Sequence, residues 1–163
     1  MAALSVEILV ILLLVLLNGL LALAEFALVS VRRARLQQLA DQGDEDARLA
    51  LEMSREPGEF LSTIQIGITL VGVLAGAFGG ATISRWLAER FREIAFLAPV
   101  SNGLALGSVV VAITLLSLVL GELVPKRLAL NRPERYALAF ARPMRALSRG
   151  VRPVVHLLNG LTE

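Results

Sequence analysis

A glutamate beside a glycine, shortly before a proline, is the most informative chemical feature of this chain. Gly121 and Glu122 precede Pro125 and Lys126 at the end of an apolar run. Proline has no N–H group, so in a helix the carbonyl oxygen four residues earlier, that of Gly121, loses its usual partner. This oxygen and the adjacent carboxylate are hard ligands that suit Mg²⁺ or another small cation. The alternative is that Glu122 pairs with Lys126, one helical turn away.

Polar and small residues recur at helical spacing in three apolar segments. The faces that this spacing defines are Asn18, Ala22 and Glu25 in the first segment, Gln65, Thr69, Gly72, Gly76 and Gly80 in the second, and Thr114, Ser117 and Gly121 in the third. The glycine spacing also has a purely structural interpretation, in which it lets helices approach closely within a subunit or across a dimer. Threonine and serine hydroxyls can likewise bond only to carbonyls of their own helix.

The depths of two glutamates in their segments are similar. Glu25 lies seven residues before Arg32, and Glu122 lies four residues before Lys126. At 1.5 Å per residue their levels differ by roughly 5 Å, although Glu25 could instead pair with a basic residue near the boundary. We therefore expect a cation site with Glu122 and the Gly121 carbonyl at its core, and further oxygen ligands from this set: Thr69, Gln65, Glu25 and Asn18.

Composition excludes several other kinds of chemistry. The chain has no cysteine and a single histidine, His156, so a metal here must be held by oxygen ligands. The apolar segments contain no HExxH motif, GxSxG elbow or aspartate dyad, so we do not expect an enzyme. The basic residues stand beside apolar segments rather than among aromatic ones, which argues against nucleic acid as a partner.

The elements that must carry these residues are membrane helices. Hydrophobic residues make up 56% of the 163 residues and charged residues only 18%, so membrane lipid is the expected surrounding. Roughly 20 apolar residues cross a bilayer, and the backbone there must satisfy its own hydrogen bonds. We predict an all-α integral membrane fold with short cytoplasmic helices in residues 33–56, an amphipathic juxtamembrane helix in residues 133–162, and three spans at about 6–31, 60–81 and 103–125.

The distribution of arginine and lysine sets the predicted orientation. Residues 32–59 contain five of these side chains, residues 126–163 contain eight, and residues 82–102 contain three. The positive-inside rule then places the N-terminus outside and the C-terminus in the cytoplasm of a cell membrane. The alternative is a cleaved signal peptide ending at Ala24, but Glu7 and the absence of Lys or Arg at the start argue against it.

The connection after the first span and the last segment have simple local patterns. The connection predicts two helices separated at Gly43, the second beginning with the acidic run from Asp44, and its charges are interpreted as a solvated face. In the last segment the residues of one face are apolar and those of the opposite face are arginines, directed toward headgroups and water. The apolar face is Phe140, Met144, Leu147, Val151, Val154 and Leu158, and the other is Arg142, Arg145, Arg149 and Arg152, with His156.

Several blocks of sequence together resemble the CNNM/CorC family, also called the hemolysin C/CorC family. The matching blocks are EFALVS from Glu25, RRARL from Arg32, TIQIGITL from Thr63, GAFGG from Gly76 and GELVPKRLAL from Gly121. They extend over nearly the whole chain, and the GELVPK block after an apolar helix is quite specific. The resemblance implies the transmembrane domain of a magnesium or divalent-cation transporter that exports Mg²⁺ with cation coupling.

The resemblance also implies partners and leaves the substrate open. It implies a homodimer and, in the full-length protein, a following pair of cytoplasmic CBS domains, which would begin about where this chain stops at Glu163. Relatives assigned to magnesium often have Ser at the position of Ala24, and Asn around Ile68, Thr69 and Gly72. A polyamine or other cation exporter, or a non-transporting anchor for CBS modules, therefore remain as alternatives.

Overall fold

A computed structural model describes the backbone of residues 2–159 and the side chains of residues 4–78 and 82–153. Within this part of the chain every regular element is helical, which confirms the all-α prediction. The elements are α1 (Ala2–Ser30), α2 (Arg33–Asp41), α3 (Glu45–Arg55), α4 (Pro57–Arg92), a 3₁₀ turn (Ala98–Val100), α5 (Ser101–Leu118), a π-helical turn (Val119–Leu123), α6 (Val124–Asn131) and α7 (Pro133–Asn159).

Three helical runs are long and apolar enough to cross a membrane, as the sequence predicts. They are Leu4–Ser30, Pro57–Arg92 and Ala98–Asn131. The second run continues to Arg92, beyond the predicted limit at Ala81. A helix can outlast its apolar segment because residues such as Leu87 and Ala88 form helix well in water too. Its last turns are further tied by Arg90, whose guanidinium lies 5.8 Å from the ring centre of Trp86.

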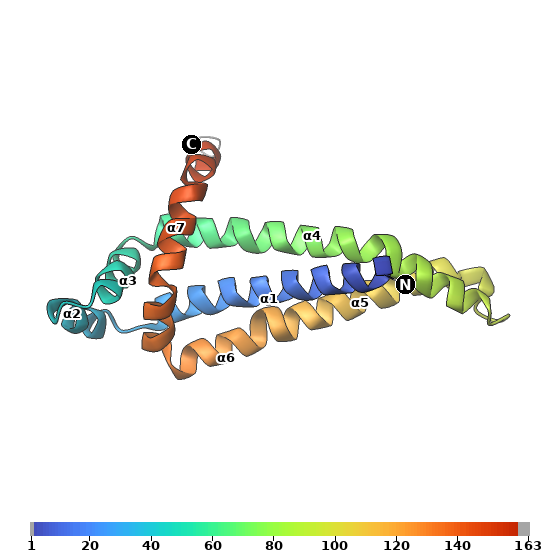
Figure 1. Ribbon diagram of the computed structural model, residues 1–163, viewed down its shortest axis with the longest axis horizontal. Coiled ribbons are helices and arrows are strands. Elements are labelled where there is room, and N and C mark those ends of the chain that lie inside the picture. The colour runs from blue at the N-terminus through green and yellow to red at the C-terminus, as the bar shows by residue number, and fades with distance from the viewer. Residues whose placement is uncertain (1, 160–163) are drawn as a thin grey trace. The chain divides into compact units, whose positions relative to one another are not determined.

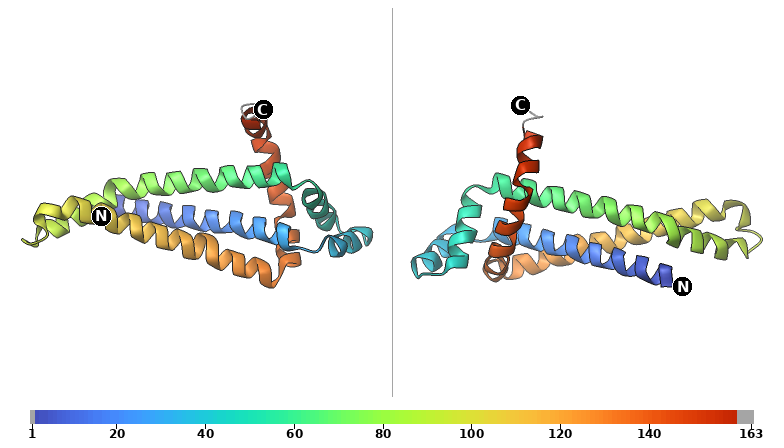
Figure 2. Two further views of the ribbon diagram at one scale, coloured as in Figure 1. Left: turned by 180° about the vertical axis from the view of Figure 1, so that it is seen from behind. Right: turned by 45° about the horizontal axis from the view of Figure 1, so that its top comes forward.

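The chain divides into two compact units. Unit 1 comprises Met1–Gly19 and Thr69–Leu123, and unit 2 comprises Leu20–Ile68 and Val124–Glu163. In unit 1 the first part of α1 runs alongside α4 and α5 (Figures 1 and 2). Side chains such as Val15 and Val109 are buried between these helices, while large apolar ones such as Val73 remain 64% exposed. An outward apolar surface of this kind is stable in lipid.

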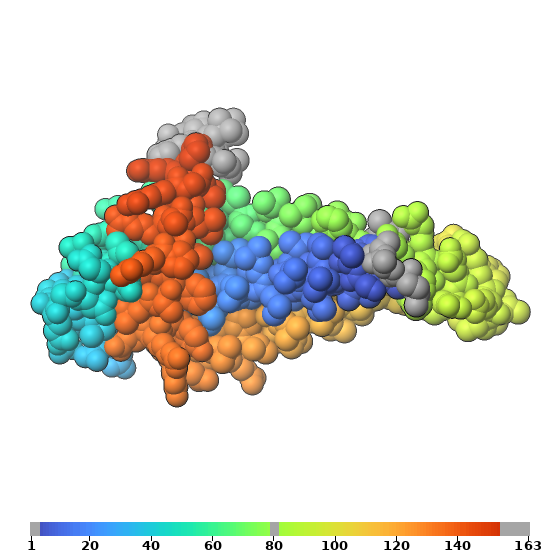
Figure 3. All heavy atoms as spheres, viewed as in Figure 1, coloured from blue at the N-terminus to red at the C-terminus, as the bar shows by residue number. Residues whose placement is uncertain are grey.

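Unit 2 holds a larger hydrophobic core. The end of α1, the start of α4, and helices α2, α3, α6 and α7 contribute to it, and Leu36 and Ile64 are almost completely buried. In the space-filling view of Figure 3 the orange and red atoms of α7 lie directly against the cyan atoms of α3. The apolar face predicted for α7 is the packed one, since Met144 is buried and Phe140 and Leu147 pack against the core.

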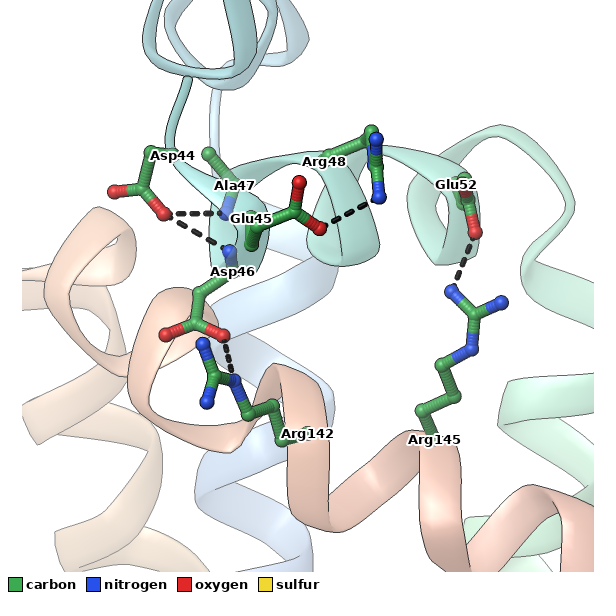
Figure 4. Close-up of polar contacts among 8 residues, drawn as sticks. All are labelled: Asp44, Glu45, Asp46, Ala47, Arg48, Glu52, Arg142 and Arg145. Atoms are coloured by element: carbon green, nitrogen blue, oxygen red, sulfur yellow. Dashed lines mark hydrogen bonds and ion pairs between the residues drawn. The ribbon is translucent and has the colours of Figure 1, made fainter. Parts of the chain in front are cut away.

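The corner between α2 and α3 follows the predicted break. Gly43 adopts a φ of +92°, a left-handed conformation that glycine tolerates without a Cβ penalty. Asp44 then caps α3, because its Oδ1 accepts hydrogen bonds from the backbone N–H groups of Asp46 at 2.9 Å and Ala47 at 3.1 Å (Figure 4).

The charges of α3 and α7 pair with each other on the surface, where their side chains stay partly exposed as the sequence predicts. Arg142 pairs with Asp46, and Arg145 Nη1 lies 2.6 Å from Glu52 Oε2 (Figure 4). Arg152 Nε is 3.5 Å from an oxygen of Glu59, at the start of α4. We call these three contacts the α7 ion pairs. The predicted positions of Gly80, Val154, His156 and Leu158 lie outside the described side chains.

Candidate cation site

A groove of about 380 Å³ in unit 1 collects several of the polar residues that the sequence singled out. Helix α1 contributes Asn18, and the π-helical turn that follows α5 contributes Glu122. The rest of the lining comes from two helices: Gly72, Ala75 and Gly76 of α4, and Val109, Val110, Ile113, Thr114, Ser117 and Leu118 of α5. The groove therefore combines an apolar wall with an amide, two hydroxyls and a carboxylate.

Asn18 gives the groove an unmet polar group. Its Nδ2 donates a hydrogen bond of 3.3 Å to the carbonyl oxygen of Gly121. Its Oδ1 is buried and has no hydrogen-bond partner among the residues that the structure describes. A buried polar atom without a partner costs free energy, so native proteins usually satisfy it with a water or an ion. The Asn18 oxygen is therefore available as an acceptor for a water or a ligand for an ion.

Gly121 is needed where it stands because Asn18 approaches so closely. A Cβ at this position would lie 2.9 Å from Asn18 Nδ2 and 3.6 Å from the backbone oxygen of Val15. The residue lies in the π-helical turn Val119–Leu123, shortly before Pro125. Such turns are frequent at functional sites, and a proline that removes an N–H donor gives this one a local cause. The carbonyl predicted to lose its α-helical partner thus receives a side-chain donor.

Glu122 supplies the charge of the groove. The side chain is partly buried and belongs to the same π-helical turn. Within the described residues no three His, Cys, Asp or Glu side chains gather into a metal-ligand group. A cation in this groove would therefore meet one carboxylate, with neutral oxygens and water as its remaining ligands.

Three of the six predicted site residues are close together in unit 1, namely Asn18, Gly121 and Glu122. Thr69 belongs to the same unit but is exposed and does not line the groove. Gln65 and Glu25 belong to unit 2, where Gln65 is exposed and Glu25 is partly buried. The structure adds Thr114 and Ser117, which the sequence marked as a polar face without assigning them to the site.

The glycines of α4 line the groove rather than a tight helix contact within the chain. A Cβ built on Gly72 or Gly76 would meet no atom of the described residues within 4 Å. The close approach predicted for Gly72 and Gly76 is therefore not made with the residues that the structure describes, and a contact across a dimer stays a prediction. Within the chain, the effect of the two glycines is to leave the α4 wall of the groove open.

Comparison with known proteins places this architecture among its relatives. Residues 8–163 match the family model described as the cyclin M transmembrane N-terminal domain. A UPF0053 protein of Synechocystis sp. is 46% identical over 162 residues, which are 99% of this chain and 36% of that protein. The UPF0053 protein YhdT of Bacillus subtilis is 35% identical over 137 residues, which are 84% of this chain and 30% of that protein.

One relative has a name that states a function. A protein of Haemophilus influenzae called polyamine export protein is 33% identical over 135 residues, which are 81% of this chain and 30% of that protein. The chain spans about a third of the length of these curated relatives.

Proposed function

Because this chain belongs to the family of cyclin M transmembrane N-terminal domains, we propose that it is the ion-handling part of a transporter for Mg²⁺ or a similar divalent cation. The chain is a multi-pass membrane domain with three apolar helices. The observation that carries the proposal is the groove of unit 1, which is lined by both Asn18 and Glu122. The side-chain oxygen of Asn18 is buried without a partner among the described residues.

The ligand set suits a hydrated Mg²⁺ ion. This ion prefers six oxygen ligands, gives up its water reluctantly and is commonly held by only one or two carboxylates. Glu122 provides one carboxylate, Asn18 an amide oxygen, and Ser117 and Thr114 hydroxyls. Six waters occupy about 180 Å³ in the liquid, so a groove of about 380 Å³ has room for an ion with much of its shell.

The rest of the proposal concerns the whole protein. Export of the cation would be coupled to another cation, in a homodimer whose cytoplasmic CBS domains follow this membrane domain. Arginine and lysine number five in residues 32–59, eight in residues 126–163 and three in residues 82–102. This asymmetry supports an outside N-terminus, a cytoplasmic C-terminus and residence in the cell membrane.

Polyamine export is the second candidate, favoured by the name of the relative in Haemophilus influenzae. A polyamine carries charges separated along a flexible chain, so it requires carboxylates separated along an elongated groove. The lining of the described groove contains one carboxylate, Glu122. The groove therefore fits a compact cation better than a polyamine.

The test replaces the charge of Glu122 and keeps its shape. We expect Glu122→Gln to abolish both thermal stabilisation by Mg²⁺ and Mg²⁺ transport into liposomes, because the groove loses its only carboxylate among the described residues. In the parent protein, Mg²⁺ at 100 times its Kd should stabilise the fold by about 2.7 kcal/mol. Far-UV circular dichroism checks that the variant still folds.

Glu89→Gln is the matched control, since Glu89 is exposed in unit 1 and does not line the groove. This variant should bind and transport Mg²⁺ like the parent. If Glu122→Gln also behaves like the parent, the site lies elsewhere. If Mg²⁺ neither stabilises the parent nor is transported by it, but putrescine does both, the groove binds a polyamine and the magnesium assignment fails.

A further inference from the structure

A second cavity, in unit 2, has four arginines in its lining and shares no lining residue with the cation groove. Its volume is about 770 Å³. The lining consists of Ser30, Val31, Arg32, Arg35, Asn131, Arg132, Pro133, Glu134, Arg135 and Leu138. We call it the arginine pocket. It joins the end of α1 and the start of α2 to the corner between α6 and α7.

The charge of this pocket is strongly unbalanced. Arg35 is neutralised by Glu134, because its Nε donates to both carboxylate oxygens at 3.2 and 3.3 Å. Arg32, Arg132 and Arg135 have no side-chain hydrogen bond or ion pair with any residue that the structure describes. Four arginines against one glutamate leave three uncompensated positive charges around one cavity.

The position of the pocket along the chain is at a membrane boundary. The helical runs that contain the first and third apolar spans end at Ser30 and Asn131, and both residues belong to the lining. Two spanning helices therefore end at this cavity. The arginines follow these ends in the chain and lie beyond the predicted apolar limits near residues 31 and 125, which is the side where headgroups are expected.

We propose that the arginine pocket binds the phosphate of an anionic phospholipid headgroup. A guanidinium presents a planar pair of N–H donors that matches phosphate oxygens, and three arginines here have no competing partner. Basic pockets at the ends of membrane helices are suited to such headgroups. Buried Val31 and partly buried Leu138 give the cavity an apolar side for the glycerol and upper acyl carbons of the same molecule.

A lipid source explains the site better than free phosphate. Free phosphate would gain nothing from the apolar side of the cavity, whereas a phospholipid contacts arginine and apolar side chains at once. The lipid would also hold the corner between α6 and α7 in place, because Arg132 and Arg135 lie on either side of Pro133, where α7 begins.

The test counts lipids bound to the purified protein by native mass spectrometry. The probes are phosphatidylglycerol, phosphatidylcholine and sodium phosphate. The pocket variant is Arg32→Gln with Arg132→Gln, which leaves the Arg35–Glu134 pair intact. The matched control is Arg33→Gln with Arg127→Gln. Arg33 begins α2 and Arg127 lies in α6, and both are exposed and do not line the pocket.

We expect the parent to retain phosphatidylglycerol in preference to phosphatidylcholine. The pocket variant should bind it roughly 30-fold more weakly, since each arginine that loses its headgroup contact costs about 1 kcal/mol, or about a fivefold factor. The control arginines make no such contact, so the control should stay within about twofold of the parent. Arg135→Gln provides a second test with a single change and should weaken binding roughly fivefold.

Three results would overturn the proposal. Equal losses in the pocket and control variants would mean that only overall charge attracts the lipid. Equal retention of the two phospholipids would mean that binding does not depend on the charge of the headgroup. Competition by sodium phosphate at the same concentration as the lipid would mean that the pocket is a site for free phosphate.

Discussion

Replacing Gly121 by alanine tests whether the close approach of Asn18 builds the cation groove. The added methyl group would lie 2.9 Å from Asn18 Nδ2, about 0.5 Å inside an ordinary van der Waals contact. The amide must then turn away, and its 3.3 Å hydrogen bond to the Gly121 carbonyl is lost. The Oδ1 atom that we assign to the cation moves with it.

The expected loss of stability follows from two opposing effects. A buried amide without its partner costs about 1–3 kcal/mol, and alanine in place of glycine stabilises a helix by up to about 1 kcal/mol. The net effect of Gly121→Ala is therefore a loss of about 1–2 kcal/mol. Gly107→Ala is the matched control on α5, because a Cβ there meets no described atom within 4 Å. This control should gain up to about 1 kcal/mol.

Unfolding in sodium dodecyl sulfate, followed by far-UV circular dichroism, measures the difference between the two variants. A gap of about 2 kcal/mol or more corresponds to roughly a 30-fold difference in the unfolding equilibrium. Gly121→Ala should also lose most of its stabilisation by Mg²⁺, whereas Gly107→Ala keeps it. Equal stability and an equal Mg²⁺ response in the two variants would refute the role assigned to Asn18.

Two further predictions concern topology and the α7 ion pairs. Single cysteines at Gln42 and Asn102 should react with an impermeant maleimide from opposite sides of the membrane, and labelling of position 42 from outside would reverse the orientation. Arg142→Glu should lower the unfolding midpoint by placing two acids together, and adding Asp46→Arg should restore much of the loss. The pair is partly exposed and is worth at most about 1 kcal/mol, so a double variant no better than Arg142→Glu would show that the pair does not form.

The helices could be predicted from the sequence because lipid leaves few choices. A bilayer requires about 20 apolar residues and an internally bonded backbone, so the three apolar runs had one structural outcome. The break at Gly43 and the cap at Asp44 were equally readable, since each follows from local backbone chemistry. The length of α4 could not be predicted, because the end of an apolar run marks the lipid boundary rather than the end of the helix.

The lining of the candidate groove could be predicted only in part, because helical spacing shows which residues share a face but not what the face meets. Asn18 and Glu122 line one groove, whereas Thr69, assigned to it by the same reasoning, is exposed. Thr114 and Ser117 also line the groove. Their hydroxyls were ambiguous in sequence because such groups often bond only to their own helix.

The arginine face of α7 shows the same limit. Periodicity separated its apolar and basic sides correctly, but a basic face has two stable surroundings, water with headgroups or the acids of another helix. In the structure Arg142 and Arg145 meet acids of α3. Choosing between these surroundings requires the tertiary position of α3, which no periodicity in α7 contains.

The charge balance of the groove bears on the proposed transport of a divalent cation. Within the described lining Glu122 offers one negative charge, so a divalent ion would keep one positive charge uncompensated by side chains. Such an ion is held more stably with part of its water than without it, because neutral oxygens from Asn18 or Ser117 replace hydration only incompletely. Transport needs binding that is favourable enough for entry and weak enough for release. A second carboxylate would favour capture over release, and the single glutamate therefore suits an ion that must leave again.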